Sequence, residues 1–436
     1  MKNSRSLEPL RPPGFFYQHI GSGSRKITTL RCEGKDLRDL AKSYGTPLYL
    51  YSAETLRGRT RTLDAAFSSF PHTLCYAVKA NSNLSLLRVL ARMGCGFDVV
   101  SGGELQRVLH ADRRAAKKIV FSGVGKTQDE IALALHAGIL LFNVESAAEL
   151  EVLIESASRL RLPARMSIRV NPDVDAKTHP YISTGLRQHK FGVPMEEASD
   201  LYARVAGHKY VKAAGISVHI GSQIVSVAPF AQAMERVAVL VSQLKTQGLE
   251  IRYVDAGGGL SIPYQGKTSD FGKYARSYAR AVLKPLRKLD VHLLLEPGRV
   301  LVGPAGVLLT SVIYTKSNRG KDFVIVDAGM NDLLRPALYQ AHHEIVPVVR
   351  DGARPRRAVD VVGPVCESGD FLARDRVLPA MKSGELLAVL DAGAYGTVQS
   401  SNYNTRGRPA EVLVEGKRAR VIRRRESFDD LVRLEK

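Results

Sequence analysis

The chain has 436 residues, of which 44% are hydrophobic, and its formal net charge is +20. This length supports two or three domains with a substantial buried core, and it excludes a short peptide, a fibre or a disordered tail. The excess of Lys and Arg over Asp and Glu favours anionic partners, among them nucleic acid, acidic membranes and negatively charged small molecules.

The cysteines and the N-terminal residues indicate the compartment. The four cysteines form no C-x-x-C pair, which argues against a zinc site or a disulfide framework and fits a reducing cytosol. Three prolines among the first thirteen residues stand where a signal peptide would need an apolar run. No later run approaches the roughly 18 apolar residues of a membrane span. We therefore expect a cytoplasmic protein that holds no metal and contacts no membrane.

The N-terminal segment contains two strand-like stretches. Residues 1–13 show no periodic pattern and are expected to form a flexible tail. FFYQHI at 15–20 and TPLYLYS at 46–52 are rich in aromatic and apolar residues, as strands are. We expect residues 14–52 to supply strands to a β domain whose other strands lie near the C-terminus.

A repeat of short apolar runs and longer segments with helical spacing begins at residue 73. The segments between the runs, such as LSLLRVLARMG at 84–94, repeat their apolar residues every three and four positions. Near-continuous apolar strands are typical of a parallel sheet that is covered on both faces. The runs are Thr73–Val78, Gly96–Val100, Lys118–Ser122, Ile139–Val144, Met166–Val170, Gly215–Ile220, Ile251–Ala256 and Val291–Glu296.

Eight repeats between residues 73 and 298 match a (β/α)8 barrel of the TIM type, which has roughly 250 residues. An open doubly wound sheet is the alternative, but no G-x-G-x-x-G turn follows the first run. The sequence therefore predicts an α/β protein with a barrel over residues 53–305.

After residue 305 the pattern changes to strands without long helices between them. One short helix is expected around residues 331–344. We predict a mostly antiparallel β domain over residues 306–436, completed by the N-terminal strands, with the barrel inserted between its two parts. The strand-like segments are 307–315, 322–329, 357–365, 386–396, 410–416 and 418–425.

Polar residues lie at the end of each of the eight predicted barrel strands or directly after it, where the active sites of barrel enzymes form. Any single one of them could be an ordinary loop residue or helix cap, but the whole set at one mouth favours an active site. The residues are Lys79, Asn81, Asp98, Ser101, Ser122, Asn143, Glu145, Arg169, Asn171, His219, Ser222, Gly257, Gly258, Gly259, Glu296 and Arg299.

Two of these strand ends suggest specific chemistry. Lys79 directly follows a strand, and a desolvated amine there would be nucleophilic enough for Schiff-base formation. A lysine that simply reaches solvent is the alternative. The three glycines at 257–259 would let backbone N–H groups approach a phosphate, although they could equally form a tight turn.

The EPGR segment and His219 complete this set. Glu296 could hold a protonated ring nitrogen and Arg299 could grip a carboxylate with two hydrogen bonds, unless the two side chains pair with each other. His219 could stack on a planar cofactor, or it could be a hydrogen-bonded core histidine.

Ten motifs, in order along the chain, carry a resemblance to a known family. Over about residues 14–430 the sequence resembles the barrel-type (fold type III) pyridoxal-phosphate-dependent decarboxylases of amino acids, and most closely the diaminopimelate decarboxylase family. The motifs are YAVKAN (76–81), FDVVSGGEL (97–105), HPYISTGLRQHKFG (179–192), HIGSQ (219–223), DAGGG (255–259), EPGR (296–299), MNDLLRPALY (330–339), CESGD (366–370), GAYG (393–396) and SNYNTR (401–406).

The resemblance implies pyridoxal 5'-phosphate as the cofactor. Lys79 would hold it covalently, His219 would stack on its ring, and Glu296 would pair with its ring nitrogen. The phosphate would be received by Ser222, Gly259, the backbone around Gly298, and Tyr395. The full cofactor-binding set is Lys79, Asp98, His219, Ser222, Gly257, Gly258, Gly259, Glu296, Gly298, Arg299 and Tyr395.

The resemblance also implies the substrate site and the quaternary structure. Cys366 would be the second catalytic residue, returning a proton to the α-carbon after CO2 has left. In this family the motifs of Cys366 and Tyr395 come from the neighbouring subunit, so a homodimer with shared active sites is implied. The substrate-binding positions are Arg299, Arg335, Tyr339, Glu367 and Tyr395.

The implied reaction is decarboxylation of meso-2,6-diaminopimelate to L-lysine and CO2, the last step of lysine biosynthesis. Arg299 and Arg335 suit a substrate with two carboxylates better than ornithine or arginine, whose far ends are cationic. A decarboxylase of ornithine, arginine or lysine on the same fold is the alternative. HIGSQ, and the residue that follows Cys366, differ from the matching segments of ornithine decarboxylases.

Two positions depart from the family pattern. Ser261 and Gly407 replace a glycine and a proline that the family often has, and we expect them to change only loop stiffness.

Three other functions are the alternatives. Basic stretches at 350–357 and 418–425 would suit nucleic acid, but no recognition motif accompanies them. An inactive family member would be expected to lose Lys79 or Cys366, and a racemase on the same barrel would not require CESGD.

Overall fold

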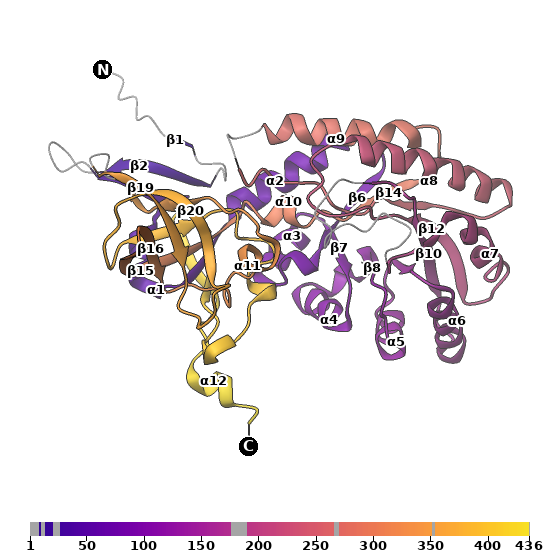
Figure 1. Ribbon diagram of the computed structural model, residues 1–436. Helices are drawn as coiled ribbons and strands as arrows, with labels where there is room; N and C mark the ends of the chain where they lie inside the picture. Colours follow the sequence, from indigo (N-terminus) through magenta and orange to yellow (C-terminus); the bar gives the residue numbers. More distant parts are fainter. Residues whose placement is uncertain are drawn as a thin grey trace. The chain divides into compact units, whose positions relative to one another are not determined.

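The computed structural model describes residues 8–9, 14–20, 27–175, 190–265, 270–350 and 354–435. Most of the HPYISTGLRQHKFG motif lies outside these ranges. The chain forms two compact units (Figure 1). The β unit comprises residues 1–58, 263–269 and 301–436, and the barrel unit comprises 59–262 and 270–300.

Eight parallel strands close into a barrel in the barrel unit, as predicted. Strand β14 pairs with β6, and β9 pairs with β10, so the sheet has no open edge between them. The barrel strands are β6 (His72–Ala77), β7 (Gly96–Val99), β8 (Ile119–Phe121), β9 (Leu141–Val144), β10 (Ala164–Asn171), β12 (Val211–Ser217), β13 (Tyr253–Asp255) and β14 (His292–Leu295).

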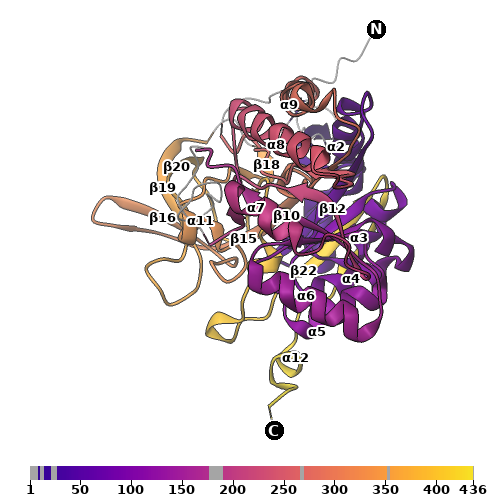
Figure 2. The same cartoon turned by 90° about the vertical axis from the view of Figure 1, so that its right-hand side faces the viewer.

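Helices surround these strands (Figure 2). Their first turns are capped by the polar residues that follow the strands: Ser101 Oγ accepts from the Glu104 N–H, and Thr127 forms a reciprocal capping box with Glu130. The helices are α2 (Ala53–Ala66), α3 (Leu84–Arg92), α4 (Gly102–Ala111), α5 (Gln128–Ala137), α6 (Ala147–Leu160), α7 (Ala198–Ala203), α8 (Ala228–Thr246) and α9 (Phe271–Leu286).

The β unit is mostly antiparallel and includes the N-terminal strands, which confirms the prediction. Its larger sheet has parallel pairs only between β16 and β19 and between β5 and β22 in the described part of the chain. The strands of this sheet are β5 (Leu48–Ser52), β15 (Gly306–Asn318), β16 (Lys321–Val326), β17 (Ile345–Pro347), β19 (Arg356–Val362), β20 (Phe371–Pro379), β21 (Leu386–Val389), β22 (Ala410–Glu415) and β23 (Arg418–Arg423).

A smaller sheet joins both ends of the chain. Phe15 and Leu30 of this sheet pack with Leu50, Val307 and Val412 of the larger sheet in one hydrophobic core, which explains why the N-terminal strands belong to this unit. The strands of the smaller sheet are β1 (Glu8–Pro9), β2 (Phe15–Ile20), β3 (Ile27–Cys32), β4 (Lys35–Asp36) and β18 (Val349–Arg350).

Several elements of the β unit differ from the sequence prediction. The predicted helix at 331–344 is only α11 (Arg335–Tyr339), because Gln340 adopts a left-handed conformation that ends it. Strand β20 was not predicted, since it lies at the edge of its sheet and mixes charged with apolar residues. The short helices α1 (Leu37–Tyr44) and α12 (Phe428–Val432) were also missed.

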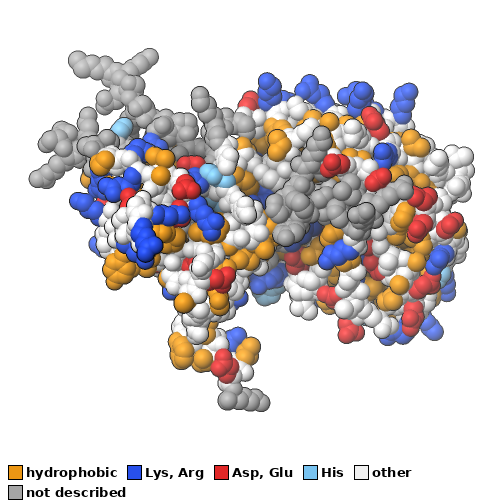
Figure 3. Space-filling model, viewed as in Figure 1, with side chains coloured by type: hydrophobic (Ala, Val, Ile, Leu, Met, Phe, Trp, Pro, Cys, Tyr) orange, Lys and Arg blue, Asp and Glu red, His pale blue; other side chains and the backbone are white. Residues whose placement is uncertain are grey.

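Part of the positive charge lies on the outer face of α9 and the turn after it, where Lys and Arg side chains form a row (Figure 3). The exposed cations are Lys273, Arg276, Arg280, Lys284, Arg287 and Lys288. Among the described residues, no helix has both the length and the apolar character needed to span a bilayer.

Candidate active site

Lys79 and Asp98 form an ion pair at the carboxyl ends of neighbouring barrel strands. Lys79 lies in a single 3-10 turn directly after β6, and its Nζ is 2.5 Å from Oδ2 of Asp98 in β7. The Asp98 side chain is fully buried, whereas that of Lys79 is 32% exposed. The amine is therefore compensated by a carboxylate rather than desolvated, which differs from the sequence expectation.

Glu296 follows β14 and is bound by buried polar groups. Ser122 Oγ donates to Glu296 Oε1 at 3.1 Å, and a side-chain hydrogen bond links Glu296 to Asp255 of β13. Burial raises the pKa of Glu296 well above its usual range, and the charges of Asp255 and Asp98 raise it further. Burial also raises the pKa of Asp255, to about 6, but the pKa of Glu296 is raised further, so Glu296 is the first of the pair to bind a proton.

His219 lies two residues beyond β12 and faces the glycine turn that follows β13. Its Nδ1 accepts from the Gly221 N–H at 3.3 Å, which leaves the proton of the neutral ring on Nε2. Burial lowers the pKa of His219 well below its usual range, and the charges of Arg169 and Lys79 add to the effect. The ring is therefore neutral at physiological pH and suited to stacking on a planar group.

The glycine turn at 257–259 packs too closely for side chains. A Cβ at Gly258 would lie 2.3 Å from the Glu296 carbonyl oxygen, and one at Gly259 would lie 2.3 Å from the Gly221 carbonyl oxygen. Gly257 and Gly259 also adopt positive φ angles of 67° and 105°. The turn thus holds the ends of β12, β13 and β14 together beside His219 and Glu296.

The segment after β14 continues with Gly298 and Arg299. A Cβ at Gly298 would lie 2.9 Å from the Ala80 side chain, so glycine allows this turn to pack against the one that carries Lys79. Arg299 is buried, and its Nη2 donates to Ser222 Oγ at 3.1 Å. Two residues predicted from separate motifs, Ser222 and Arg299, are therefore in direct contact.

Glu145 and Arg169 form a second buried ion pair at the ends of β9 and β10. Arg169 Nη1 donates to Glu145 Oε1 at 2.9 Å, and its guanidinium lies 4.9 Å from the centre of the Phe191 ring. Glu145 Oε1 also accepts from the Gly123 N–H. These contacts fix Arg169 where its charge keeps the pKa of His219 low.

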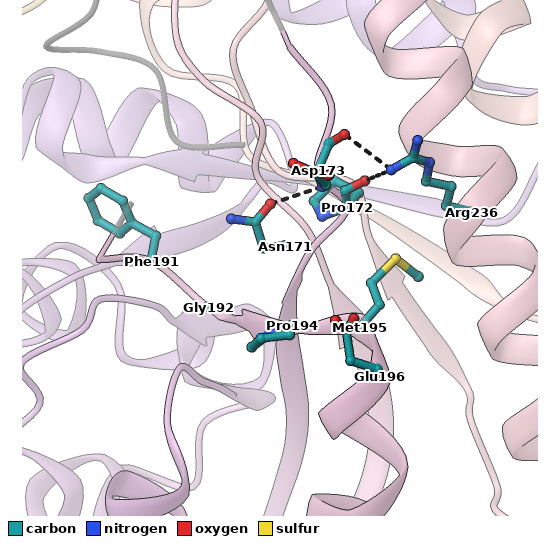
Figure 4. A pocket seen from close by; sticks show the side chains of 9 residues that line it. All are labelled: Asn171, Pro172, Asp173, Phe191, Gly192, Pro194, Met195, Glu196 and Arg236. Atoms are coloured by element: carbon teal, nitrogen blue, oxygen red, sulfur yellow. Dashed lines mark hydrogen bonds between the residues drawn. The ribbon is translucent and has the colours of Figure 1, made fainter. Parts of the chain in front are cut away.

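The turn after β10 is fixed by backbone contacts rather than by a ligand-like cluster (Figure 4). Asn171 Oδ1 accepts from the Asp173 N–H at 2.9 Å, and Arg236 of α8 donates to the carbonyl oxygens of Pro172 and Asp173. Asn81 Oδ1 likewise accepts from the Asn83 N–H. Asn171 and Asn81, like the cap residue Ser101, thus make the local contacts expected of ordinary loop residues.

The remaining predicted residues belong to the β unit. Cys366 and Glu367 are exposed in the segment between β19 and β20. The Cys366 N–H donates to Asn404 Oδ1 at 2.9 Å, and a hydrogen bond from the Tyr403 hydroxyl to Glu367 raises the pKa of Tyr403. Tyr395 is partly buried and has a positive φ of 56°.

Arg335 is buried at the start of α11 and is bound on two sides. Its Nη1 donates to His343 Nε2 at 2.6 Å, and its guanidinium lies 4.5 Å from the centre of the Tyr264 ring. His343 Nδ1 donates to the Leu390 carbonyl oxygen, which leaves Nε2 as an acceptor. Tyr339, at the end of α11, accepts a hydrogen bond at 3.4 Å from Gln399 Nε2.

Sequence reasoning missed the partners that hold these residues. Asp255 was seen only as part of the DAGGG motif, and Tyr264, His343 and Asn404 were not considered as site residues. A charged residue at the last position of a buried strand, as Asp255 is, was the one available signal.

Comparison with known proteins places the barrel unit in a family. Residues 53–303 match the family described as "Pyridoxal-dependent decarboxylase, pyridoxal binding domain". The chain therefore belongs to the pyridoxal-dependent decarboxylases, which bind their cofactor in a barrel.

Full-length relatives define the family more closely. The diaminopimelate decarboxylase of Pseudomonas aeruginosa is 52% identical over 94% of this chain and 97% of its own length, and that of Vibrio cholerae is 48% identical over 97% and 98%. The crystal structure of diaminopimelate decarboxylase from Helicobacter pylori complexed with L-lysine has a TM-score of 0.87 at 42% identity, covering 92% of this chain and 99% of that one. The chain is a member of the diaminopimelate decarboxylase family.

The barrel residues fit pyridoxal phosphate. A primary amine, a protonated carboxyl group and a neutral imidazole, from Lys79, Glu296 and His219, are the groups needed to bind its aldehyde, its ring nitrogen and its ring face. Asp98 Oδ1 is buried and has no hydrogen-bond partner among the described residues, which leaves an acceptor beside Lys79.

We predict that Gly258→Ala weakens cofactor binding by about tenfold or more, a loss of about 1.4 kcal/mol. The new Cβ would lie 2.3 Å from the Glu296 carbonyl oxygen and push the turn away from Glu296 and His219. The dissociation constant can be measured by absorbance titration of the apoprotein with pyridoxal phosphate. Gly125→Ala is the matched control, because nothing lies within 4 Å of a Cβ at that position. Equal affinity in the two variants would show that the turn tolerates a side chain.

Proposed function

We propose that the protein decarboxylates meso-2,6-diaminopimelate to L-lysine and CO2, using pyridoxal phosphate bound in the barrel. The main support is the buried carboxyl pair of Glu296 and Asp255, which lies close to Lys79. The chain is also 52% identical to the diaminopimelate decarboxylase of Pseudomonas aeruginosa over 94% of its length. The reaction is the last step of lysine biosynthesis, and the enzyme is a carboxy-lyase.

The barrel residues bind and orient the cofactor in this proposal. When bound, pyridoxal phosphate supplies the electron sink for the electron pair that remains at the α-carbon as CO2 leaves. Lys79 provides the amine that holds the cofactor, and Asp98 provides the charge that orients this amine. Glu296 holds a proton at the ring nitrogen, and the neutral His219 ring supports the cofactor face without adding a positive charge.

The phosphate end is assigned to Ser222, Arg299 and the glycine turn. Ser222 and Arg299 are already hydrogen-bonded to each other and offer a hydroxyl and a guanidinium. The glycines at 257–259 carry no side chains of their own, so their backbone N–H groups can approach a phosphate, as in the phosphate sites common in barrels. Gly298 belongs to the same set because its turn packs on the turn of Lys79.

The β unit is proposed to supply the substrate-binding groups and the general acid. Arg335 is a buried guanidinium whose orientation is fixed by His343 and Tyr264, and a fixed cation favours a substrate with a distal carboxylate. Tyr339, Glu367 and Tyr395 are assigned to the substrate by family likeness. Cys366 is exposed and able to return a proton to the α-carbon.

We further propose a cytoplasmic homodimer with shared active sites. The exposed thiol of Cys366 supports sharing, because a general acid must be covered from water during the reaction and a second subunit can provide that cover. All four cysteines are free thiols, which supports a reducing compartment.

The substrate assignment is tested by CO2 release from meso-diaminopimelate, ornithine, arginine and lysine, each supplied with the pyridoxal-phosphate-loaded protein. We expect release from meso-diaminopimelate alone, and we expect Lys79→Ala to abolish it. Lys273→Ala, which removes an exposed lysine from α9, is the control and should leave the rate unchanged. CO2 release only from a diamino acid with a cationic end would overturn the role given to Arg335. No CO2 release from any of the four amino acids would favour a racemase or a regulator.

Shared sites are tested by mixing two inactive variants, Lys79→Ala and Cys366→Ala. If Lys79 and Cys366 of one site come from different subunits, half of the dimers after re-equilibration are mixed and each has one intact site. We expect about a quarter of the wild-type activity to return. Recovery of no activity, with dimer exchange verified by a size or mass label, would place both residues in one subunit.

A further inference from the structure

Asn143 connects the buried carboxylates of the barrel into one hydrogen-bond network. Its Nδ2 lies 2.9 Å from Asp255 Oδ2 and 3.0 Å from Ser122 Oγ, and its Oδ1 accepts from Ser167 Oγ at 2.6 Å. All four of these residues are buried, with at most 5% of any one exposed. The network spans β9, β10, β13 and the residue after β8.

The chemistry of these groups fixes the direction of every hydrogen bond. A carboxylate only accepts, so the Asn143 amide must donate to Asp255, and its second N–H is then directed to Ser122. Ser122 has one proton, which it donates to Glu296 Oε1. Asp255 Oδ1 accepts from the Gly257 N–H at 2.9 Å. Asp255 thus accepts from a donor at each oxygen, which favours its ionised form and leaves the proton of the pair to Glu296.

We propose that Asp255, held by Asn143, is a positioning residue that keeps a proton on Glu296 and thereby supplies the proton that the ring nitrogen of pyridoxal phosphate needs. This inference rests on the proposed function. The proton moves from the Glu296 carboxyl group to the ring nitrogen and leaves a carboxylate paired with a pyridinium, so no further proton donor is required. The negative charge of Asp255 behind Glu296 then stabilises the pyridinium in a site that excludes water.

The other titratable groups around this pair do not replace Asp255. Asp98 of β7 contributes negative charge to the pair, but its carboxylate is paired with Lys79. The charge of Lys79 acts against protonation of Glu296. Cys75 of β6 and Tyr278 of α9 face the same carboxylates, and burial raises the pKa of both, so they remain neutral.

The test measures the protonation of the cofactor ring as a function of pH. The readout is the 15N chemical shift of the ring nitrogen in labelled pyridoxal phosphate bound to the protein. In Asp255→Asn the shape of the side chain is kept and its charge is removed. We expect the pH midpoint of ring protonation to fall by about one unit or more, the effect of losing a neighbouring buried charge. We expect kcat to fall by about tenfold while KM changes little, because the charge acts on the electron sink and not on substrate binding.

Two further variants make the result decisive. Asn143→Ala keeps Asp255 but removes the amide that donates to it, so the proton shifts from Glu296 towards Asp255. The pH midpoint of ring protonation should then fall as in Asp255→Asn, but by a smaller amount. This variant tests the proposal if Asp255→Asn does not fold. Asp36→Asn removes a buried carboxylate that caps α1 in the β unit, and it should leave the midpoint unchanged.

The outcomes separate this inference from the proposed function. An unchanged midpoint in the folded variants, in an enzyme that releases CO2 from meso-diaminopimelate, would overturn the role of Asp255 and leave the function intact. A lowered midpoint in a protein that acts on a different substrate would support the role of Asp255 and overturn the substrate assignment.

Discussion

The structure of the barrel unit depends on burying three carboxyl groups at one end of its sheet. Asp98 lies one residue before the end of β7, Asp255 ends β13 and Glu296 follows β14, and each is at most 5% exposed. An unpaired buried charge costs several kcal/mol, so each group must find a cation, a donor or a proton. Lys79 compensates Asp98, the amide of Asn143 and the Gly257 N–H compensate Asp255, and Glu296 is protonated. Replacing buried charged groups with a packed apolar core often stabilises a protein, so this arrangement is better explained by the proposed cofactor site than by stability.

The rest of the site follows from keeping these groups in place. A closed barrel fixes the strand ends against one another, and the turns between strands and helices need only short connections. The glycines at 257–259 allow the ends of β12, β13 and β14 to pack at backbone distance, which brings His219 beside Glu296. Burial lowers the pKa of His219, and the charge of Arg169, which is held by Glu145, lowers it further, so the histidine ring adds no positive charge to the site.

Sequence reasoning predicted the elements whose signal is local. The eight apolar runs and the helical spacing between them predict the barrel because both periods appear in consecutive residues. Lys79 and Glu296 were found because Lys79 directly follows one run and Glu296 ends another. Strand β20 was missed because one edge of it is exposed and its charged residues interrupt the apolar pattern. The hydrogen bonds from Asn143 to Asp255 and from Arg335 to His343 were missed as well. The hydrogen bond from Asn143 to Asp255 depends on how the barrel strands pair, and the one from Arg335 to His343 depends on where a short helix ends. Neither produces a periodic pattern in the sequence.

We propose that Glu296, supported by Asp255 and Ser122, receives the ring nitrogen of the cofactor that Lys79 holds. A crystal structure of the protein with pyridoxal phosphate tests it most directly. We expect a covalent link from Lys79 Nζ to the cofactor, a hydrogen bond between Glu296 and the ring nitrogen, and retention of the contacts of Glu296 with Ser122 and Asp255. A ring nitrogen that faces any other residue, or a Glu296 side chain turned away from Asp255, would contradict it.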